Sequence, residues 1–217
     1  MNNDLGIFGD SSAALNKDFE HSWVTLLSQD QKFDNYAAEG ASLVYVYDQL
    51  IKHGKNYKKC IIFIPPVGRL WMPDFNRQHF VNHRTVDLLN RSSFLDQKIL
   101  SSIKDYFINI WNYKREKLIQ CALVDSIRLR YPTALIIPVT PDSVYDDPKC
   151  MHHISLLDNE FYNVHEHERD WGRACHMNRE NNKIFFQKIV HWIKTDNFDL
   201  DVKDFKYPVE LKTELFR

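Results

Sequence analysis

The 217-residue chain has few cysteines, almost no net charge and no long apolar run. Its four cysteines include no CxxC pair, which argues against a zinc knuckle and a thioredoxin-like motif. A net charge of −1 gives no general attraction to nucleic acid or to an anionic membrane. No apolar run approaches the roughly 20 residues of a membrane span, and no signal-peptide pattern opens the chain. We therefore expect a cytoplasmic protein with no membrane or nucleic acid partner.

The chain does have an alternation of short apolar runs with helix-like segments. Short continuous or β-branched runs predict strands at Leu5–Phe8, Lys32–Tyr36, Cys60–Ile64 and Thr133–Val139. Apolar residues in helical period predict helices at Asp18–Gln29, Ser42–His53, Asp96–Arg130 (one long helix or two broken ones) and Arg179–Lys194. In the third of these, the residues in period are Ile99, Ile103, Phe107, Ile110, Leu118, Cys121 and Val124. Cys60 and Cys121 are expected to be buried thiols.

Strands separated by helices imply right-handed crossovers. We therefore predict an α/β fold, a three-layer α/β/α sandwich with a mainly parallel central sheet. A single domain is expected over residues 1–217, with an insertion at about residues 67–95 and a charged C-terminal extension at about residues 196–217. In such sheets ligands bind beyond the carboxyl ends of the strands. The segments to consider for a site are therefore Gly9–Ser11, Asn35–Gly40 and Pro65–Arg69.

Gly9-Asp10-Ser11 directly follows the first predicted strand, and a helix-like segment comes after it. A tight turn there places the Ser11 hydroxyl at the carboxyl end of a strand, near a helix N-terminus with its free N–H groups. A serine so placed can attack a carbonyl while its own backbone N–H helps to hold the oxyanion. The alternative is an ordinary turn whose serine caps a helix.

Two further stretches contain residues suited to a site. Gly40 lies just before a predicted helix, where glycine allows a close backbone approach to a ligand. His176 lies in a predicted loop just before the last helix, six residues after Asp170. Taken singly, these are also the features of a capped helix start and of a surface histidine.

In this order the three stretches resemble the SGNH (GDSL-type) hydrolase family. Gly9-Asp10-Ser11 is similar to the family's first block, and His176 with Asp170 occupies the location of its last block. The second block is matched at Asn35, Ala37, Gly40 and Ser42, and the form Cys-His-Leu-x-x-Glu-Asn is approximated by Cys175-His176-Met177 followed by Glu180-Asn181. The resemblance extends over residues 5–195 as scattered blocks.

The resemblance implies a flavodoxin-like topology and an esterase or deacetylase that forms an acyl-enzyme. Ser11 would be the nucleophile, His176 the general base and Asp170 the acid that orients the histidine. The N–H groups of Ser11 and Gly40 would form part of the oxyanion hole. The substrate would be a small or carbohydrate-linked acyl ester, with no metal or other cofactor.

Two positions depart from the family's pattern. The third block, Gly-x-Asn-Asp, is replaced by Gly68-Arg69 without an asparagine, so Arg69 is either an oxyanion or anion donor or a loop arginine paired with a carboxylate. The usual Asp-x-x-His spacing would place the acid at Arg173. Asp158 or Glu168 can replace Asp170, or a Ser–His dyad can act alone.

Three alternatives remain beside this reading. The missing asparagine and the displaced aspartate also fit a catalytically weakened SGNH-like binding or structural module. The histidine-rich stretch can form a metal site or a solvated loop. Its histidines are His165 and His167, with His152 and His153, and its acidic residues are Glu166, Glu168 and Asp170.

The insertion can cover the substrate or pack onto the domain. It carries Trp71, Phe75, Phe80 and Phe94 with Arg69, Arg77, Arg84, Arg91 and His79. Asp10 and Trp71 are the expected substrate contacts.

Overall fold

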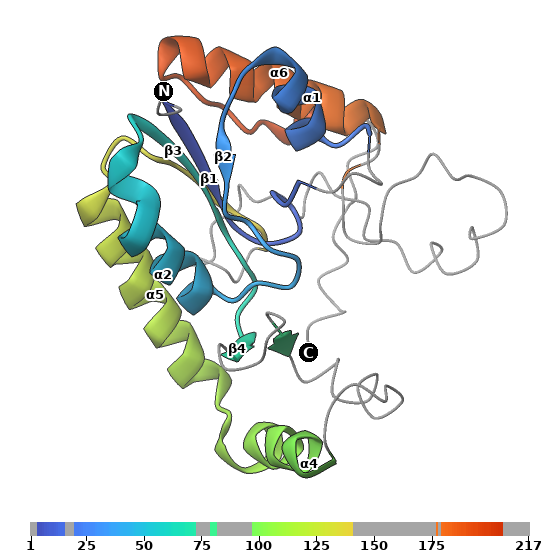
Figure 1. Cartoon of the computed structure of the whole chain (residues 1–217), viewed down its shortest axis with the longest axis vertical. Coiled ribbons are helices and arrows are strands. Elements are labelled where there is room, and N and C mark those ends of the chain that lie inside the picture. Colours follow the sequence, from blue (N-terminus) through green and yellow to red (C-terminus); the bar gives the residue numbers. More distant parts are fainter. Residues whose placement is uncertain are drawn as a thin grey trace, which may run out of the picture.

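The computed structural model describes residues 4–15, 20–72, 79–81, 97–140, 177 and 179–205. The strands are β1 (Leu5–Phe8), β2 (Asp34–Asn35), β3 (Lys59–Ile64), β4 (Leu70–Met72), β5 (His79–Val81) and β6 (Leu135–Pro138) (Figure 1). The α-helices are α1 (Trp23–Asp30), α2 (Leu43–His53), α4 (Gln97–Asp105), α5 (Tyr113–Arg130) and α6 (Arg179–Thr195). Short 3₁₀ turns span Gly54–Asn56 and Val202–Asp204, and a π-helix spans Tyr106–Ile110.

Four parallel strands form the central sheet, in the order β2-β1-β3-β6. Ile7 pairs with Asn35 on one side and with Ile61 on the other, and Ile61 pairs with Leu135. The chain adds β2 on one side of β1 and then crosses to place β3 on the other side. The strand order therefore reverses between β1 and β3, and such a switch point is where open α/β sheets bind ligands.

Alternate residues of the buried strands face two separate cores, because successive side chains of a strand point to opposite faces. Ile61 and Phe63 join one core with α1 and α6, and Ile62 and Ile64 join the other with α2 and α5. Figure 1 shows α1 with α6 on one side of the sheet and α2 with α5 on the other. The predicted α/β architecture, a parallel sheet between two helical layers, is confirmed.

Serine caps set the start of two helices. Ser22 and Ser42 accept hydrogen bonds from Thr25 N and Tyr45 N, respectively. The predicted start of the first helix at Asp18 is wrong, because α1 begins only at Trp23, after the Ser22 cap. In α2, the predicted bounds hold to within one residue at the start.

The segment predicted at Asp96–Arg130 is broken rather than continuous. The π-helix at Tyr106–Ile110 and the Asn112 cap separate α4 from α5. The buried positions of α5 are Gln120, Cys121, Val124 and Ile127. Leu118 is 72% exposed and Ile110 is 56% exposed, so including them in one apolar face was wrong. The break explains the exposure of Ile110, which lies before it, whereas Leu118 lies within α5 on a side of the helix away from Gln120, Val124 and Ile127.

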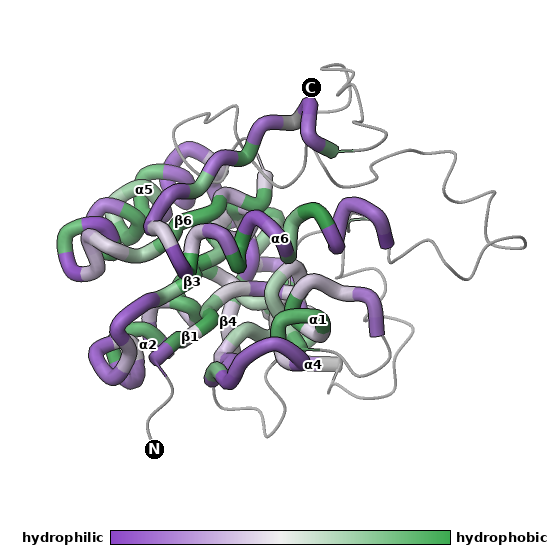
Figure 2. Tube along the Cα trace, turned by 90° about the horizontal axis from the view of Figure 1, so that it is seen from above, coloured by the Kyte–Doolittle hydropathy of each residue, from purple (hydrophilic) through white to green (hydrophobic). Residues whose placement is uncertain are grey.

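Hydropathy follows this layering. In Figure 2, the central strands are mainly hydrophobic, while α6 alternates between hydrophilic and hydrophobic along its length.

Cys60 and Cys121 are buried free thiols, as predicted. In the insertion, β4 and β5 pair antiparallel, with Trp71 opposite Phe80. Among the described helices, none has both the length and the apolar character needed to cross a membrane.

Candidate functional site

Ser11 lies in a tight turn directly after β1, and its side chain is half-buried. The turn is closed by a hydrogen bond from Ala13 N to Asp10 O of 3.0 Å. Gly9 allows this turn to lie against β3, because a Cβ at Gly9 would be 2.7 Å from the Cβ of Phe63. The predicted strand, turn and serine therefore occur together at the carboxyl end of the sheet.

The buried side chain of Asp10 holds the turn that contains Ser11 (the serine turn) in place. It is 1% exposed, and one carboxylate oxygen accepts a hydrogen bond from Ser12 N at 2.9 Å. The other oxygen pairs with Arg69 Nη1 at 2.7 Å. Both oxygens of the carboxylate are thus bonded to the protein, one to the backbone of the turn itself and the other to Arg69 in the loop after β3.

The loop after β2 is bonded to the serine turn at two points. Ala38 N donates to Gly9 O at 3.1 Å, and Asn35 Nδ2 donates to Ala13 O at 2.8 Å. Gly40 follows in a turn with φ of +74°, a left-handed conformation that glycine adopts without strain. The two segments predicted to supply oxyanion N–H groups are therefore fixed to each other.

The loop after β3 completes this end of the sheet. Arg69 Nη1 donates to Ala41 O at 3.2 Å as well as to Asp10, so one guanidinium nitrogen bridges the β1 and β2 loops. Gln120 of α5 is buried and donates from Nε2 to Pro65 O at 2.9 Å. Arg69 is thus paired with a carboxylate, which is one of the two roles considered for it from the sequence.

Trp71 of β4 lies next to this arrangement, in contact with α2. Its ring meets the ring of Tyr45 edge-on, with centroids 5.5 Å apart. Within the described residues, the buried Nε1 of Trp71 has no hydrogen-bond partner. A buried donor without an acceptor is uncommon, and a bound polar group is one way to satisfy it.

The other predicted site residues lie outside the described residues. They are His176 and Asp170, the substitute acids Asp158 and Glu168, and the histidines and Glu166 of the metal alternative. Met177, which directly follows His176, is described and buried in the α1–α6 core. Over the described ranges, no group of three or more His, Cys, Asp or Glu side chains is placed to hold a metal ion.

Three polar or aromatic residues that support this end of the sheet were not predicted from the sequence. Gln120 anchors the β3 loop, and Trp23 and Asn182 connect the serine turn to the start of α6. Two adjacent asparagines at a helix start are the one visible signal for Asn182. Gln120 lies within an apolar period, where a single polar residue in the buried register indicates a specific partner.

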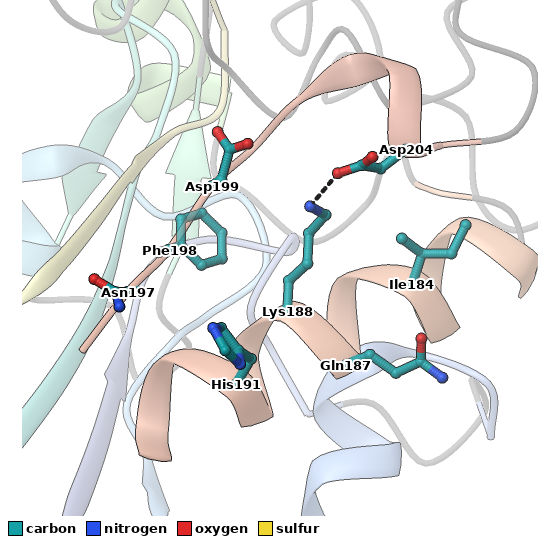
Figure 3. Close-up of a pocket in the computed structure, with 8 residues that line it drawn as sticks. All are labelled: Ile184, Gln187, Lys188, His191, Asn197, Phe198, Asp199 and Asp204. Carbon is teal, nitrogen blue, oxygen red and sulfur yellow. Dashed lines mark hydrogen bonds and ion pairs between the residues drawn. The ribbon is translucent and has the colours of Figure 1, made fainter. Parts of the chain in front are cut away.

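A surface hollow of about 470 Å³ lies elsewhere, between α6 and the segment that follows it. Figure 3 shows the ion pair of Lys188 and Asp204 across this hollow, with Phe198 and His191 along its wall. It lies beside the face of α6 that carries the buried Phe185, Ile189 and Trp192, and two of its lining residues, Ile184 and Phe198, pack against the same core. Among the described residues that line it there is no predicted site residue, so it is separate from the described loops around Ser11.

The arrangement at the carboxyl ends can support nucleophilic chemistry. The Ser11 hydroxyl is half-buried in a turn that hydrogen bonds hold in place, and the loops after β2 and β3 are both bonded to this turn. A base near Ser11 would activate it, and N–H groups in fixed positions stabilise a developing oxyanion better than mobile ones.

The chain matches no model of a known protein family and no curated protein sequence. Among solved structures, it is similar to the crystal structure of a member of the lipolytic protein G-D-S-L family from Veillonella parvula DSM 2008. The identity is 13%, the TM-score is 0.40, and the match covers 88% of this chain and 98% of that chain. At this identity and TM-score the match indicates nothing about the function of this chain.

Proposed function

We propose that this chain is a serine-dependent ester hydrolase of the SGNH type, with Ser11 as its nucleophile. The observation that carries the proposal is the position of Ser11, half-buried in a turn directly after β1. This turn borders the reversal of strand order between β1 and β3, where α/β sheets bind ligands. The bonds made by Asp10 and Ser12 fix the backbone on both sides of the hydroxyl.

In the proposed reaction, Ser11 Oγ attacks the ester carbonyl while His176 accepts the hydroxyl proton. The N–H groups of Ser11 and Gly40 stabilise the tetrahedral oxyanion. The C–O bond to the alcohol then breaks, and His176 returns the proton to the leaving alkoxide. Water, deprotonated by His176, attacks the acyl-enzyme, which releases the acid and restores Ser11. Asp170 orients the histidine in this scheme.

Arg69 has two proposed roles in the site. Its Nη1 holds Asp10 and Ala41 in place, so it shapes the serine turn. Its other guanidinium nitrogens have no hydrogen-bond acceptor within the described part of the chain. They are therefore the groups proposed to meet an oxyanion or an anionic substituent of the substrate, at the place where the family's pattern has an asparagine.

The proposed substrate is a small or carbohydrate-linked acyl ester. Trp71 supports this choice, because an indole combines an apolar face with one N–H donor. Its unpaired Nε1 is suited to a substrate oxygen. Asp10, the other substrate contact expected from the sequence, is buried and bonded on both oxygens. We propose that Asp10 acts on the substrate only through the turn that it holds.

One observation favours a second candidate, a weakened SGNH-like binding module. An arginine that is committed to a buried carboxylate has less freedom to move onto an oxyanion than an amide side chain would. Such a module would bind the same ester-bearing ligands without hydrolysing them. A purified protein that binds but does not turn over an ester would distinguish this candidate from the enzyme.

Hydrolysis of a short-chain p-nitrophenyl ester by the purified protein tests the proposal. Ser11→Ala should abolish the activity, and His176→Ala should nearly abolish it. Ser28→Ala is the matched control, because this serine of α1 is exposed and, among the described residues, its hydroxyl bonds to Thr25 O of its own helix. Undiminished hydrolysis by Ser11→Ala would overturn the mechanism.

A further inference from the structure

A chain of three hydrogen bonds links the serine turn to the start of α6. Trp23 Nε1 donates to Ser12 O at 2.8 Å. Trp23 N donates to Asn182 Oδ1 at 2.9 Å, and Asn182 Nδ2 donates to Met177 O at 2.8 Å. The amide of Asn182 thus uses its acceptor toward α1 and its donor toward the segment that precedes α6.

The middle of this chain is held rigidly by packing. Trp23 is 1% exposed, and its ring stacks on Phe63 with centroids 5.5 Å apart and meets Phe185 edge-on at 5.3 Å. The indole therefore has no room to turn, and its N–H points at Ser12 O in a fixed direction. The backbone N–H of Trp23 is in the first turn of α1, where it has no partner within the helix. Asn182 supplies that partner.

Each end of the chain is one residue away from a proposed catalytic group. Ser12 follows Ser11, and Met177 follows His176. Consecutive Cα atoms are about 3.8 Å apart, so fixing the backbone of one residue restricts where its neighbour can lie. Ser12 is also bonded through its N–H to Asp10, which prevents the turn from shifting independently.

We propose that Asn182 is a positioning residue that, together with Trp23, sets the segment carrying His176 in register with the Ser11 turn. The inference rests on the proposed function for its catalytic consequence. The hydrogen bonds themselves do not depend on that function. Asn182 acts through Trp23 and Met177 and touches neither the substrate nor the reacting atoms. The distance between base and nucleophile is decisive, because a misplacement of about 1 Å can reduce the rate by about a hundredfold.

The test uses Asn182→Asp, which keeps the size of the side chain and its acceptor but removes the donor to Met177 O. The matched control is Asn112→Asp, since Asn112 caps α5 through its oxygen, and aspartate caps equally well. We expect Asn182→Asp to lower kcat for a p-nitrophenyl ester about tenfold to a hundredfold, with KM within twofold. Asn112→Asp should change neither.

A double-mutant measurement separates positioning from general destabilisation. In a His176→Ala background, Asn182→Asp should change the rate at which a fluorophosphonate labels Ser11 by less than twofold, because the group that it positions is gone. In the wild-type background it should slow the labelling by the same factor as it lowers kcat. An equal loss in both backgrounds would overturn the positioning role.

Amide hydrogen exchange tests the linkage without relying on activity. Asn182→Asp should accelerate exchange in peptides that contain Met177 and in those that contain Ser12, and Asn112→Asp should accelerate neither. Unchanged exchange in both peptides would overturn the inference, whatever the activity. Accelerated exchange in a protein whose Ser11 does not react would support the linkage and overturn the proposed function instead. Asn182→Ala, which adds no charge, provides the same readouts if the aspartate variant does not fold.

Discussion

The two ends of the parallel sheet each carry an ion pair between distant chain segments, and the two pairs differ in burial. At the carboxyl end, Asp10 and Arg69 are 2.7 Å apart, with side chains 1% and 18% exposed. At the amino end, Lys58 and Asp4 are 3.1 Å apart, with side chains 79% and 72% exposed. Water compensates for a lost partner only where the pair is exposed. The end that holds Ser11 therefore depends on the Asp10–Arg69 pair, whereas the amino end does not depend on the Lys58–Asp4 pair.

The two ends also differ in what they connect. At the amino end, Lys59 Nζ donates to Ile193 O at 2.7 Å and pairs with Asp196 at 2.5 Å, which ties a cation to the C-terminus of α6. At the carboxyl end, side chains bond to the backbone of neighbouring loops, as Asn35 and Gln120 do. The first arrangement fastens a helix to the sheet. The second holds three loops in one geometry, which a preorganised site requires.

The largest expected effect comes from breaking the buried pair. Arg69→Ala leaves the Asp10 carboxylate buried without its cation, and we expect the free energy of unfolding to fall by about 3 kcal/mol. Arg69 is slightly exposed, which places this figure at the lower end for such pairs. Urea unfolding followed by circular dichroism measures the change. A loss below about 1 kcal/mol would show that the two ion pairs do not differ as described.

A smaller change in the free energy of unfolding is expected at the amino end of the sheet. It comes from the titration of a buried thiol rather than from an ion pair. Burial raises the pKa of Cys60, at the start of β3, from 9.0 to about 11. The folded protein then holds the proton more tightly than the unfolded chain, so this stabilisation is complete below pH 9 and is lost as the pH rises to 11. The unfolding free energy of the wild type should fall by about 2 kcal/mol relative to Cys60→Ala across this window.

Urea unfolding at several pH values between 8 and 11 measures this difference, and Val46→Ala is the matched control. Val46 lies in the same core but does not titrate, so its difference from the wild type should stay constant with pH. A constant difference for Cys60→Ala as well would contradict the shift in the pKa of Cys60.

Trp71→Phe tests whether the carboxyl end contacts the substrate through the indole N–H. Phenylalanine keeps an aromatic ring against Tyr45 but has no donor. The loss of one hydrogen bond should raise KM for a p-nitrophenyl ester about threefold to tenfold and leave kcat within twofold. Steady-state kinetics separate the two constants, and an unchanged KM would exclude Trp71 as a substrate donor.

The smallest effect is expected from the exposed pair. Lys58→Ala should change the free energy of unfolding by about 0.5 kcal/mol or less, because both side chains are largely in water. Raising the salt concentration should reduce this difference further. If urea unfolding showed a loss equal to that of Arg69→Ala, the contrast between the two ends would not hold.

Local patterns predicted the strands that are buried on both faces, because these strands are short apolar runs in the sequence. The predicted strand Leu5–Phe8 agrees with β1 residue for residue, and Cys60–Ile64 misses only Lys59 of β3. The parallel arrangement followed from the alternation of strands and helices. The break before α5 was not fixed by pattern alone, because Ile110 and Leu118 continue the apolar period on either side of it, although both are exposed. The predicted single domain stays a prediction.

Contacts at the site could be predicted only where a local motif encodes them. Gly9-Asp10-Ser11 is such a motif, and its turn lies where the pattern indicated. The Asp10–Arg69 pair joins residues 59 positions apart, and the Trp23–Asn182 bond joins residues 159 positions apart. A single sequence contains no distance information at such separations. The roles of His176, Asp170, Gly40 and Arg69 in catalysis likewise stay predictions.

Covalent labelling of the purified protein with a fluorophosphonate, followed by peptide mapping, tests the central claim most directly. The reagent reports an activated serine without knowledge of the substrate. We predict stoichiometric modification at Ser11, which Ser11→Ala abolishes and His176→Ala slows strongly. No labelling at Ser11, or labelling of another serine in its place, would contradict the assignment of Ser11 as the nucleophile.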